Sequence, residues 1–214
     1  MLKTGILLDF ITVDGMEAGT AAGSAGALGF TGTPLNDAVL FVHNVLVGAN
    51  LRKHIKVIAS GKVLTERDII AKVVRGADIC ATARGMMISV GCDQQRECYK
   101  GTCQRGIATQ DPQLLKHFDV LSSTEKIANY HRITIEELAE LVSIAGATHP
   151  AQLPPFCLQK RVSPFEVKAL DEIYPFIQAG GLLSILPWAV PADYRKSWQR
   201  AKHDAPFAAL AGAV

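Results

Sequence analysis

Ile55-Lys-Val-Ile-Ala-Ser-Gly-Lys62 is the stretch of sequence that decides the fold class. Its first five residues are rich in β-branched side chains and predict a short strand, which the Ser-Gly-Lys turn ends. Thr65 and Asp68 then have the spacing of a capping box in front of a helix with a regular apolar face, and Gly76 stands where that helix should end. Strand, turn and helix together predict one βα unit.

Similar units lie on both sides of this stretch. Upstream, residues 5–13 predict a strand, and a Gly/Ala-rich loop leads to Thr33, which we expect to cap a helix beginning at Pro34. Downstream, residues 77–82 predict a third strand that Arg84 and Gly85 connect directly to another helix. This alternation is typical of an α/β fold with a parallel sheet.

The composition fits one soluble domain. The chain has 214 residues, of which 49% are hydrophobic and 20% charged, and this excludes disordered, collagen-like and coiled-coil proteins. A net charge of +2 gives no electrostatic footprint for nucleic acid, and no apolar run reaches the ~20 residues of a membrane span. Five cysteines without a secretory signal predict reduced thiols or metal ligands in a cytoplasmic protein.

Cys92, Cys98 and Cys103 form a C-x5-C-x4-C cluster within the polar loop 91–112. Three thiolates on one glycine-containing loop suit an iron–sulfur cluster or zinc, and three ligands match a cluster of three irons. The alternative is three buried, unligated cysteines, since free cysteine is common in protein cores.

Two turns that follow consecutive strands could hold a phosphate. Ser60-Gly-Lys62 ends one strand and Ala83-Arg-Gly85 ends the next, so backbone N–H groups and two cationic side chains would meet there. Ordinary βα turns with solvated charges are the alternative. The small-residue loop after the first strand, with Glu17, Gly19 and Thr20, is a further candidate site, because small residues let a ligand or backbone approach closely. A flexible loop is the alternative. His43 lies within a helical pattern and is interpreted as a structural residue rather than a base.

The second half of the chain is predicted to be helical. Helices are expected over residues 112–118, 123–131 and 134–145, with Thr134 capping the last one. Beyond Gly146 the chain is rich in proline, which indicates an extension over 147–214 packed on the domain 1–146.

Taken together, these motifs resemble the FMN-binding glutamate synthase family, in particular its stand-alone members without a glutaminase domain. The resemblance covers residues 5 to about 175. It rests on the three cysteines and on the following runs: Leu8-Asp-Phe-Ile-Thr-Val-Asp-Gly15, Gly32-Thr-Pro-Leu35, Phe41-Val-His-Asn44, Ala59-Ser-Gly-Lys62, Ala83-Arg-Gly85, Gly106-Ile-Ala-Thr-Gln-Asp-Pro112 and Val162-Ser-Pro164.

The resemblance implies an oxidoreductase with a (β/α)8 TIM barrel that binds FMN and a 3Fe-4S cluster. Such enzymes reductively aminate 2-oxoglutarate with ammonia, through 2-iminoglutarate, to L-glutamate. The implied cluster ligands are Cys92, Cys98 and Cys103. The implied FMN-binding residues are Ser60, Gly61, Lys62, Ala83, Arg84, Gly85, Glu17, Gly19 and Thr20.

The resemblance also implies that most of the barrel lies outside this chain. The three predicted strands correspond to the last three βα units, and 214 residues are fewer than the ~250 typical of a full barrel. We therefore expect an upstream polypeptide to supply the other strands, no catalytic residue here, and no activity from this chain alone. One alternative is a truncated or split non-catalytic remnant that at most binds a cluster. Another is an IMP dehydrogenase-like barrel, which would not explain the cysteine loop.

Overall fold

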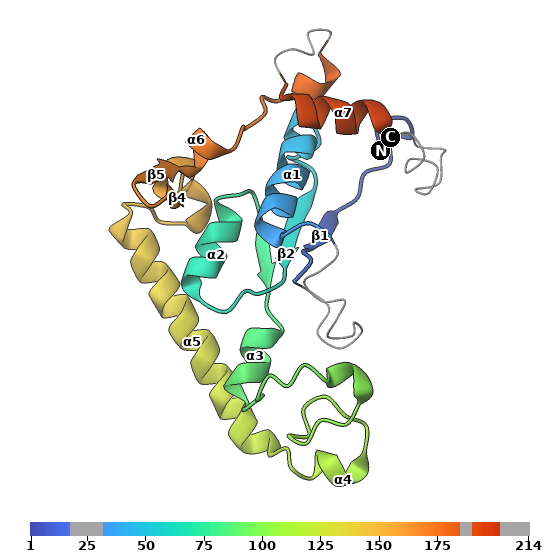
Figure 1. The fold of residues 1–214 in the computed structure, drawn as a ribbon, viewed down its shortest axis with the longest axis vertical. Coiled ribbons are helices and arrows are strands. Elements are labelled where there is room, and N and C mark those ends of the chain that lie inside the picture. The colour runs from blue at the N-terminus through green and yellow to red at the C-terminus, as the bar shows by residue number, and fades with distance from the viewer. Residues whose placement is uncertain (18–31, 185–189, 202–214) are drawn as a thin grey trace.

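The computed structural model describes residues 1–17, 32–184 and 190–201, and at its centre lies a three-stranded parallel sheet (Figure 1). The strands are β1 (Phe10–Asp14), β2 (Lys56–Ser60) and β3 (Ile79–Ala81), in the order β1-β2-β3. β2 pairs in parallel with both neighbours. The predicted α/β class with a parallel sheet is therefore confirmed, although β1 begins five residues later than expected.

Two helices cover one face of the sheet. α1 (Leu35–Gly48) packs on β1 and β2, and α2 (Glu66–Val73) packs on β3. The sheet contributes alternate residues to the core beneath these helices, as the period of two in a strand requires. The central buried residues are Val13, Leu35, Val39, Leu46, Ile55, Val57, Ala59 and Ala77.

The opposite face of the sheet is uncovered in the described part of the chain. Phe10 of β1 is 58% exposed and Ile79 of β3 is 51% exposed. The register places both side chains on the same face, because Ile79 is aligned through Ile58 with Thr12, two residues after Phe10. Parallel sheets are normally covered on both faces, so this surface is typical of one that packs against further structure.

The helix boundaries test the capping predictions. Thr65 and Asp68 form the predicted capping box at the start of α2, and Gly76 has a φ of 103° just beyond the end of that helix. The predicted cap at Thr33 is wrong: α1 begins at Leu35, whose backbone N–H donates to Oε2 of Glu17 at 2.9 Å. A carboxylate 18 residues upstream therefore supplies the partner that a neighbouring hydroxyl was expected to supply.

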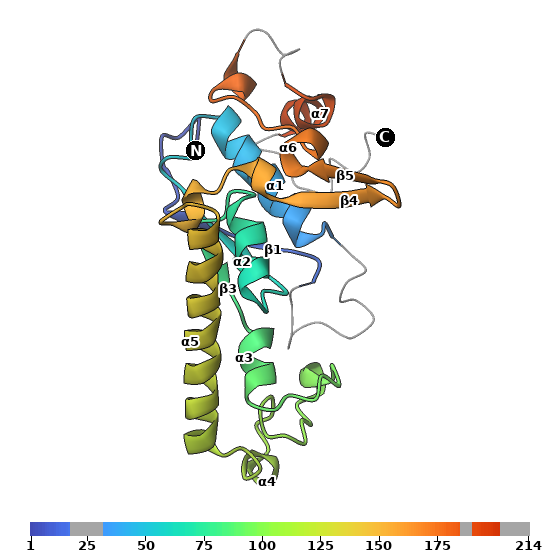
Figure 2. The same cartoon turned by 90° about the vertical axis from the view of Figure 1, so that its left-hand side faces the viewer.

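Beyond β3 the chain is mostly helical up to residue 144. The elements are α3 (Arg84–Ser89), the 3-10 turn η1 (Cys98–Lys100), α4 (Pro112–Leu115) and α5 (Val120–Ile144). The two helices predicted over 123–131 and 134–145 are one continuous helix, and the predicted cap at Thr134 is wrong. The Thr134 hydroxyl donates to the carbonyl oxygen of Tyr130 inside α5. Figures 1 and 2 both show α5 running beside α2 and α3.

The C-terminal segment is more than the helical extension that was predicted. It contains the turns η2 (Pro150–Gln152), η3 (Pro155–Cys157) and η4 (Gly181–Leu183), the antiparallel hairpin β4 (Gln159–Ser163) and β5 (Glu166–Ala169), and the helices α6 (Leu170–Ile173) and α7 (Ala192–Arg200). The hairpin was missed because its strands are polar and mostly exposed, so no apolar alternation marks them. No helix among the described residues is long and apolar enough to cross a membrane.

Asn44 connects this segment to α1. Its side chain is 1% exposed and its Nδ2 donates both to the carbonyl oxygen of Pro175 and to the Tyr194 hydroxyl, each at 2.8 Å. Its Oδ1 accepts from the Ile177 backbone N–H at 3.2 Å. One buried amide thus satisfies three groups of the C-terminal segment. The domain boundary at residue 146 stays a prediction.

Candidate functional site

The carboxyl ends of the three strands meet at one edge of the sheet. Asp14, Ser60 and Ala81 are aligned across β1, β2 and β3, and the Gly15 N–H donates to the Ser60 carbonyl oxygen at 3.3 Å. In open parallel α/β sheets, ligands bind outside this edge, where the βα turns begin. The turns after β2 and β3, which the sequence singled out, therefore begin side by side.

The two turns carry the predicted phosphate-binding residues. Gly61 and Lys62 have φ values of 134° and 44°, so the chain turns sharply through the left-handed region directly after β2. Lys62 is exposed, Arg84 is half-buried at the start of α3, and Gly85 is buried. Two cationic side chains on adjacent turns suit an anion, and their contact with a flavin phosphate stays a prediction.

α5 braces both turns from outside. The Tyr130 hydroxyl donates to the carbonyl oxygen of Leu64, in the segment after β2, at 2.7 Å. The Thr82 hydroxyl donates to the Val63 carbonyl oxygen and so joins the turn after β3 to the same segment. A Cβ at Gly85 would overlap the Tyr130 hydroxyl, so glycine is the residue that lets α5 approach this closely.

The cysteine loop follows α3, and its three thiols are half-buried and free. The backbone N–H of Gln94 donates to Sγ of Cys92 at 3.4 Å. Burial raises the pKa of the Cys103 thiol, but hydrogen bonds from the backbone N–H groups of Ala108, Ile107 and Arg105 outweigh burial, and the pKa lies below its ordinary value. Such N–H···S bonds favour the thiolate, which is the form that ligates metals.

The cysteine loop and the turn after β3 interact electrostatically. Burial and the nearby Cys92 and Cys103 thiols raise the pKa of Cys98, while the positive charge of Arg84 opposes this shift.

The three thiols do not form a ready-made site for a single metal ion. Within the described ranges, no group of three or more His, Cys, Asp or Glu side chains lies close enough to hold one ion. Thiolates are the ligands that iron–sulfur clusters and zinc prefer. The assignment of Cys92, Cys98 and Cys103 as its ligands stays a prediction.

The third candidate loop is described only in part. Glu17 lies at the end of the described segment and its Oε2 accepts from the first N–H of α1, which gives this carboxylate a structural partner. Gly19 and Thr20 lie outside the described residues. Contact between these three residues and a flavin stays a prediction.

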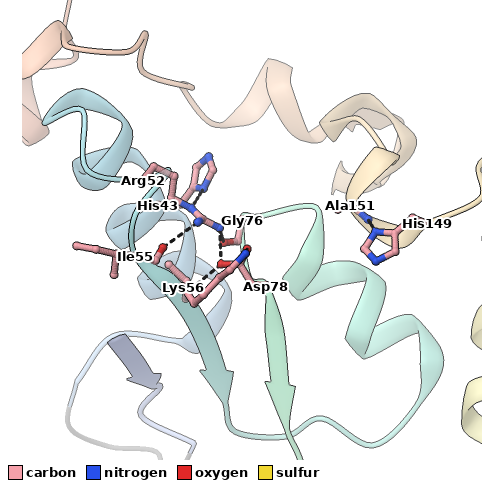
Figure 3. A network of polar contacts seen from close by, with 9 residues as sticks. His43, Arg52, Ile55, Lys56, Gly76, Asp78, His149 and Ala151 are labelled. Atoms are coloured by element: carbon pink, nitrogen blue, oxygen red, sulfur yellow. Dashed lines mark hydrogen bonds and ion pairs between the residues drawn. The ribbon is translucent and has the colours of Figure 1, made fainter. Parts of the chain in front are cut away.

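A polar network at the opposite end of the strands was missed in the sequence (Figure 3). Arg52 donates from Nη2 to Oδ2 of Asp78 at 2.7 Å and to the Gly76 carbonyl oxygen at 2.9 Å. It also donates from Nη1 to the carbonyl oxygen of Ile55 and from Nε to Nδ1 of His43. One guanidinium thus ties the amino ends of β2 and β3 to α1. No spacing rule connects these four partners, so only the fold reveals them.

His43 is neutral within this network. Burial and the positive charge of Arg52 lower the pKa of His43 to about 4, against a smaller opposing effect of Asp78. Because Nδ1 accepts from the guanidinium, the ring carries its proton on Nε2. The structural role predicted for His43 is consistent with these contacts.

This combination defines a class: a parallel β/α protein with basic turns at the carboxyl edge of its sheet and a thiol-rich loop after α3. Residues 3–148 match the family model described as the conserved region in glutamate synthase. The chain therefore belongs to the glutamate synthase family.

The relatives point to the same family. The chain is 39% identical over 150 residues to the glutamate synthase large subunit-like protein YerD of Bacillus subtilis. This match covers 70% of this chain and 29% of that protein. The chain is 33% identical over 138 residues to the archaeal glutamate synthase [NADPH] of Methanocaldococcus jannaschii, covering 64% of this chain and 27% of that protein. It thus spans less than a third of the length of these relatives.

Proposed function

We propose that this chain is the C-terminal part of a glutamate synthase-like iron–sulfur flavoprotein that reductively aminates 2-oxoglutarate to L-glutamate. In this proposal the sheet β1-β2-β3 supplies the last three strands of a (β/α)8 barrel, and an upstream polypeptide supplies the others. The single observation that carries the proposal is the uncovered face of the sheet.

That face is the one a barrel would enclose. In a β/α barrel the helices pack outside the strands, and the inward side chains fill the centre. Here α1 and α2 cover one face, and Phe10 and Ile79 protrude from the other into solvent. Because each side chain is already about half buried, completing their burial is worth roughly 1 kcal/mol each, which favours assembly with further strands.

The residues proposed to hold FMN are those of the two neighbouring turns. Ser60, Gly61 and Lys62 would offer backbone N–H groups and a cation to the phosphate. Ala83, Arg84 and Gly85 would do so from the turn after β3. The side-by-side strand ends and the common brace from α5 support this assignment, because they hold the two turns together without a ligand.

Cys92, Cys98 and Cys103 are proposed as ligands of a 3Fe-4S cluster next to that site. The electrostatic effect of Arg84 on Cys98 supports the proximity, since a cluster must lie near the flavin to exchange electrons with it. When bound, the two cofactors would supply the electrons that reduce 2-iminoglutarate. Thiolate ligation needs a reducing compartment, and we therefore place the protein in the cytoplasm.

Substitution of one cysteine tests the cluster assignment. The chain and the polypeptide encoded upstream of it are purified together without oxygen, and visible absorption and iron content are measured. We expect Cys98→Ser to abolish the cluster absorption and most of the iron. Cys157→Ser is the matched control, because Cys157 is an exposed free cysteine outside the loop. An unchanged iron content in Cys98→Ser would refute the ligand assignment.

A further inference from the structure

A cavity lies on the helix-covered side of the fold, between α1, α2 and the C-terminal hairpin. Its volume is about 420 Å³, and its wall includes Asn36, Asp37, Arg75, Lys160 and Tyr174. None of its lining residues belongs to the carboxyl-edge turns or to the cysteine loop. It is therefore separate from the site proposed for the cofactors.

Arg75 is a buried cation without an anionic partner in this cavity. The residue is 8% exposed, and its Nη1 donates to the Ala71 carbonyl oxygen at 2.7 Å. Its Nε is buried and has no hydrogen-bond partner among the described residues. No carboxylate of the described residues lies within ion-pair distance of the Arg75 guanidinium. Arg52 differs, because its Nε, Nη1 and Nη2 all donate to protein acceptors.

An unpaired buried cation is unusual because it costs several kcal/mol unless an anion or acceptor reaches it. Burial lowers the pKa of Arg75, and the Tyr174 and Asp37 side chains oppose this shift. A guanidinium remains charged under all ordinary conditions. The cavity therefore presents a fixed positive charge that suits a carboxylate.

Acceptor groups lie on the wall formed by α1. The side-chain oxygen Oδ1 of Asn36 is buried and has no hydrogen-bond partner in the described structure. Asp37 lies next to it and acts electrostatically on Arg75, but the two form no ion pair, so a gap separates the carboxylate from the guanidinium. Opposite charges that face one cavity without touching can be bridged by a molecule that carries both.

We propose that this cavity binds a free α-amino acid in its zwitterionic form. The carboxylate of the ligand pairs with Arg75, and its ammonium group donates to the carboxylate of Asp37, which lies on the same cavity wall. Lys160, whose Nζ lies over the Tyr174 ring at 5.9 Å from its centre, is a second cation on the cavity wall. A simple dicarboxylate fits less well, because Asp37 would repel its second charge.

Titration calorimetry on the full chain tests this proposal, with L-alanine and L-glutamine as probes at millimolar concentration. Acetate and ethylamine are the matched probes, because each carries only one of the two charged groups. We expect heat from both amino acids and at least tenfold weaker binding of either half-ligand, the loss of about one charge-assisted hydrogen bond. Absence of heat with both amino acids, or acetate binding as tightly as L-alanine, would overturn the proposal.

Variants locate the binding. Arg75→Met and Asp37→Asn should each weaken amino-acid binding at least tenfold, and Lys53→Met, which removes an exposed cation outside the cavity, should not change it. Circular dichroism verifies that each variant is folded. If Arg75→Met does not fold, Asp37→Asn tests the proposal by itself, because its isosteric side chain leaves the packing intact. Unchanged affinity in Asp37→Asn would overturn the proposal.

Discussion

The hydroxyl of Tyr130 donates to the carbonyl oxygen of Leu64 at 2.7 Å, across 66 positions of sequence. This bond joins the long helix α5 to the segment that follows the Ser60-Gly-Lys62 turn. The proposed cofactor site thus depends on a contact made far from it in the chain.

Tyr130→Phe removes this bond and keeps the ring. We expect the free energy of unfolding to fall by about 1 kcal/mol, the usual net value of one hydrogen bond plus part of the cost of an unsatisfied carbonyl. Flavin affinity of the assembled complex should also fall, because the turn loses its brace. Urea denaturation and flavin titration measure the two effects. Wild-type stability in the variant would show that the bond contributes nothing.

Gly85→Ala should be harmful for a related reason. The new methyl group would overlap the Tyr130 hydroxyl and lie 2.8 Å from the Thr82 hydroxyl oxygen. Overpacking of this kind costs about 1–3 kcal/mol. In the double variant with Tyr130→Phe the cost should be smaller than the sum of the two single costs, because the tightest overlap, with the hydroxyl, is removed while that with ring carbon Cζ at 2.9 Å remains. Strict additivity in denaturant unfolding would contradict the packing described.

Asn44→Ala should loosen the C-terminal segment. The substitution removes three hydrogen bonds and leaves the Pro175 carbonyl and the Ile177 N–H without their partner. We expect a loss of about 3 kcal/mol and faster proteolytic cleavage after residue 175. Asn129→Ala, at an exposed position of α5, is the control for cleavage. Identical digestion of wild type and Asn44→Ala would argue against this anchor.

His43 makes stability depend on pH in the acidic range. Its folded-state pKa of about 4 lies below the ordinary value near 6.5, so the unfolded chain binds the proton first. The contribution of neutral His43 to the free energy of unfolding is therefore fully present above pH 6.5. It falls by up to about 3 kcal/mol as the pH drops to 4. His43→Gln should flatten this dependence, whereas His54→Gln, at an exposed histidine, should not. An unchanged slope in His43→Gln would show that the pKa of His43 is the same in the folded and unfolded chains, against the burial described.

The sequence predicted the local features of the fold and missed those that depend on distant contacts. The parallel βα alternation and the capping box at Thr65 follow from residues a few positions apart. The cap of α1 comes from Glu17, which no local pattern connects to Leu35. The break expected near Thr134 does not occur, because its hydroxyl bonds within the helix instead of ending it.

The candidate site shows the same division. The turns after β2 and β3 were predictable because parallel strands align their carboxyl ends. The brace by Tyr130 and the unpaired Arg75 were not, since both depend on how α5 and the hairpin pack against the βα units. The polar strands of the hairpin carry no alternation from which its position could be inferred.

Reconstitution tests the central claim most directly. The chain is purified without oxygen, alone and together with the polypeptide encoded upstream, and flavin absorption and glutamate formation from 2-oxoglutarate and ammonia are measured with a chemical reductant. The account predicts flavin and glutamate formation only in the complex. Bound flavin in the chain alone would contradict the shared site, and a complex with neither flavin nor glutamate formation would contradict the proposed function.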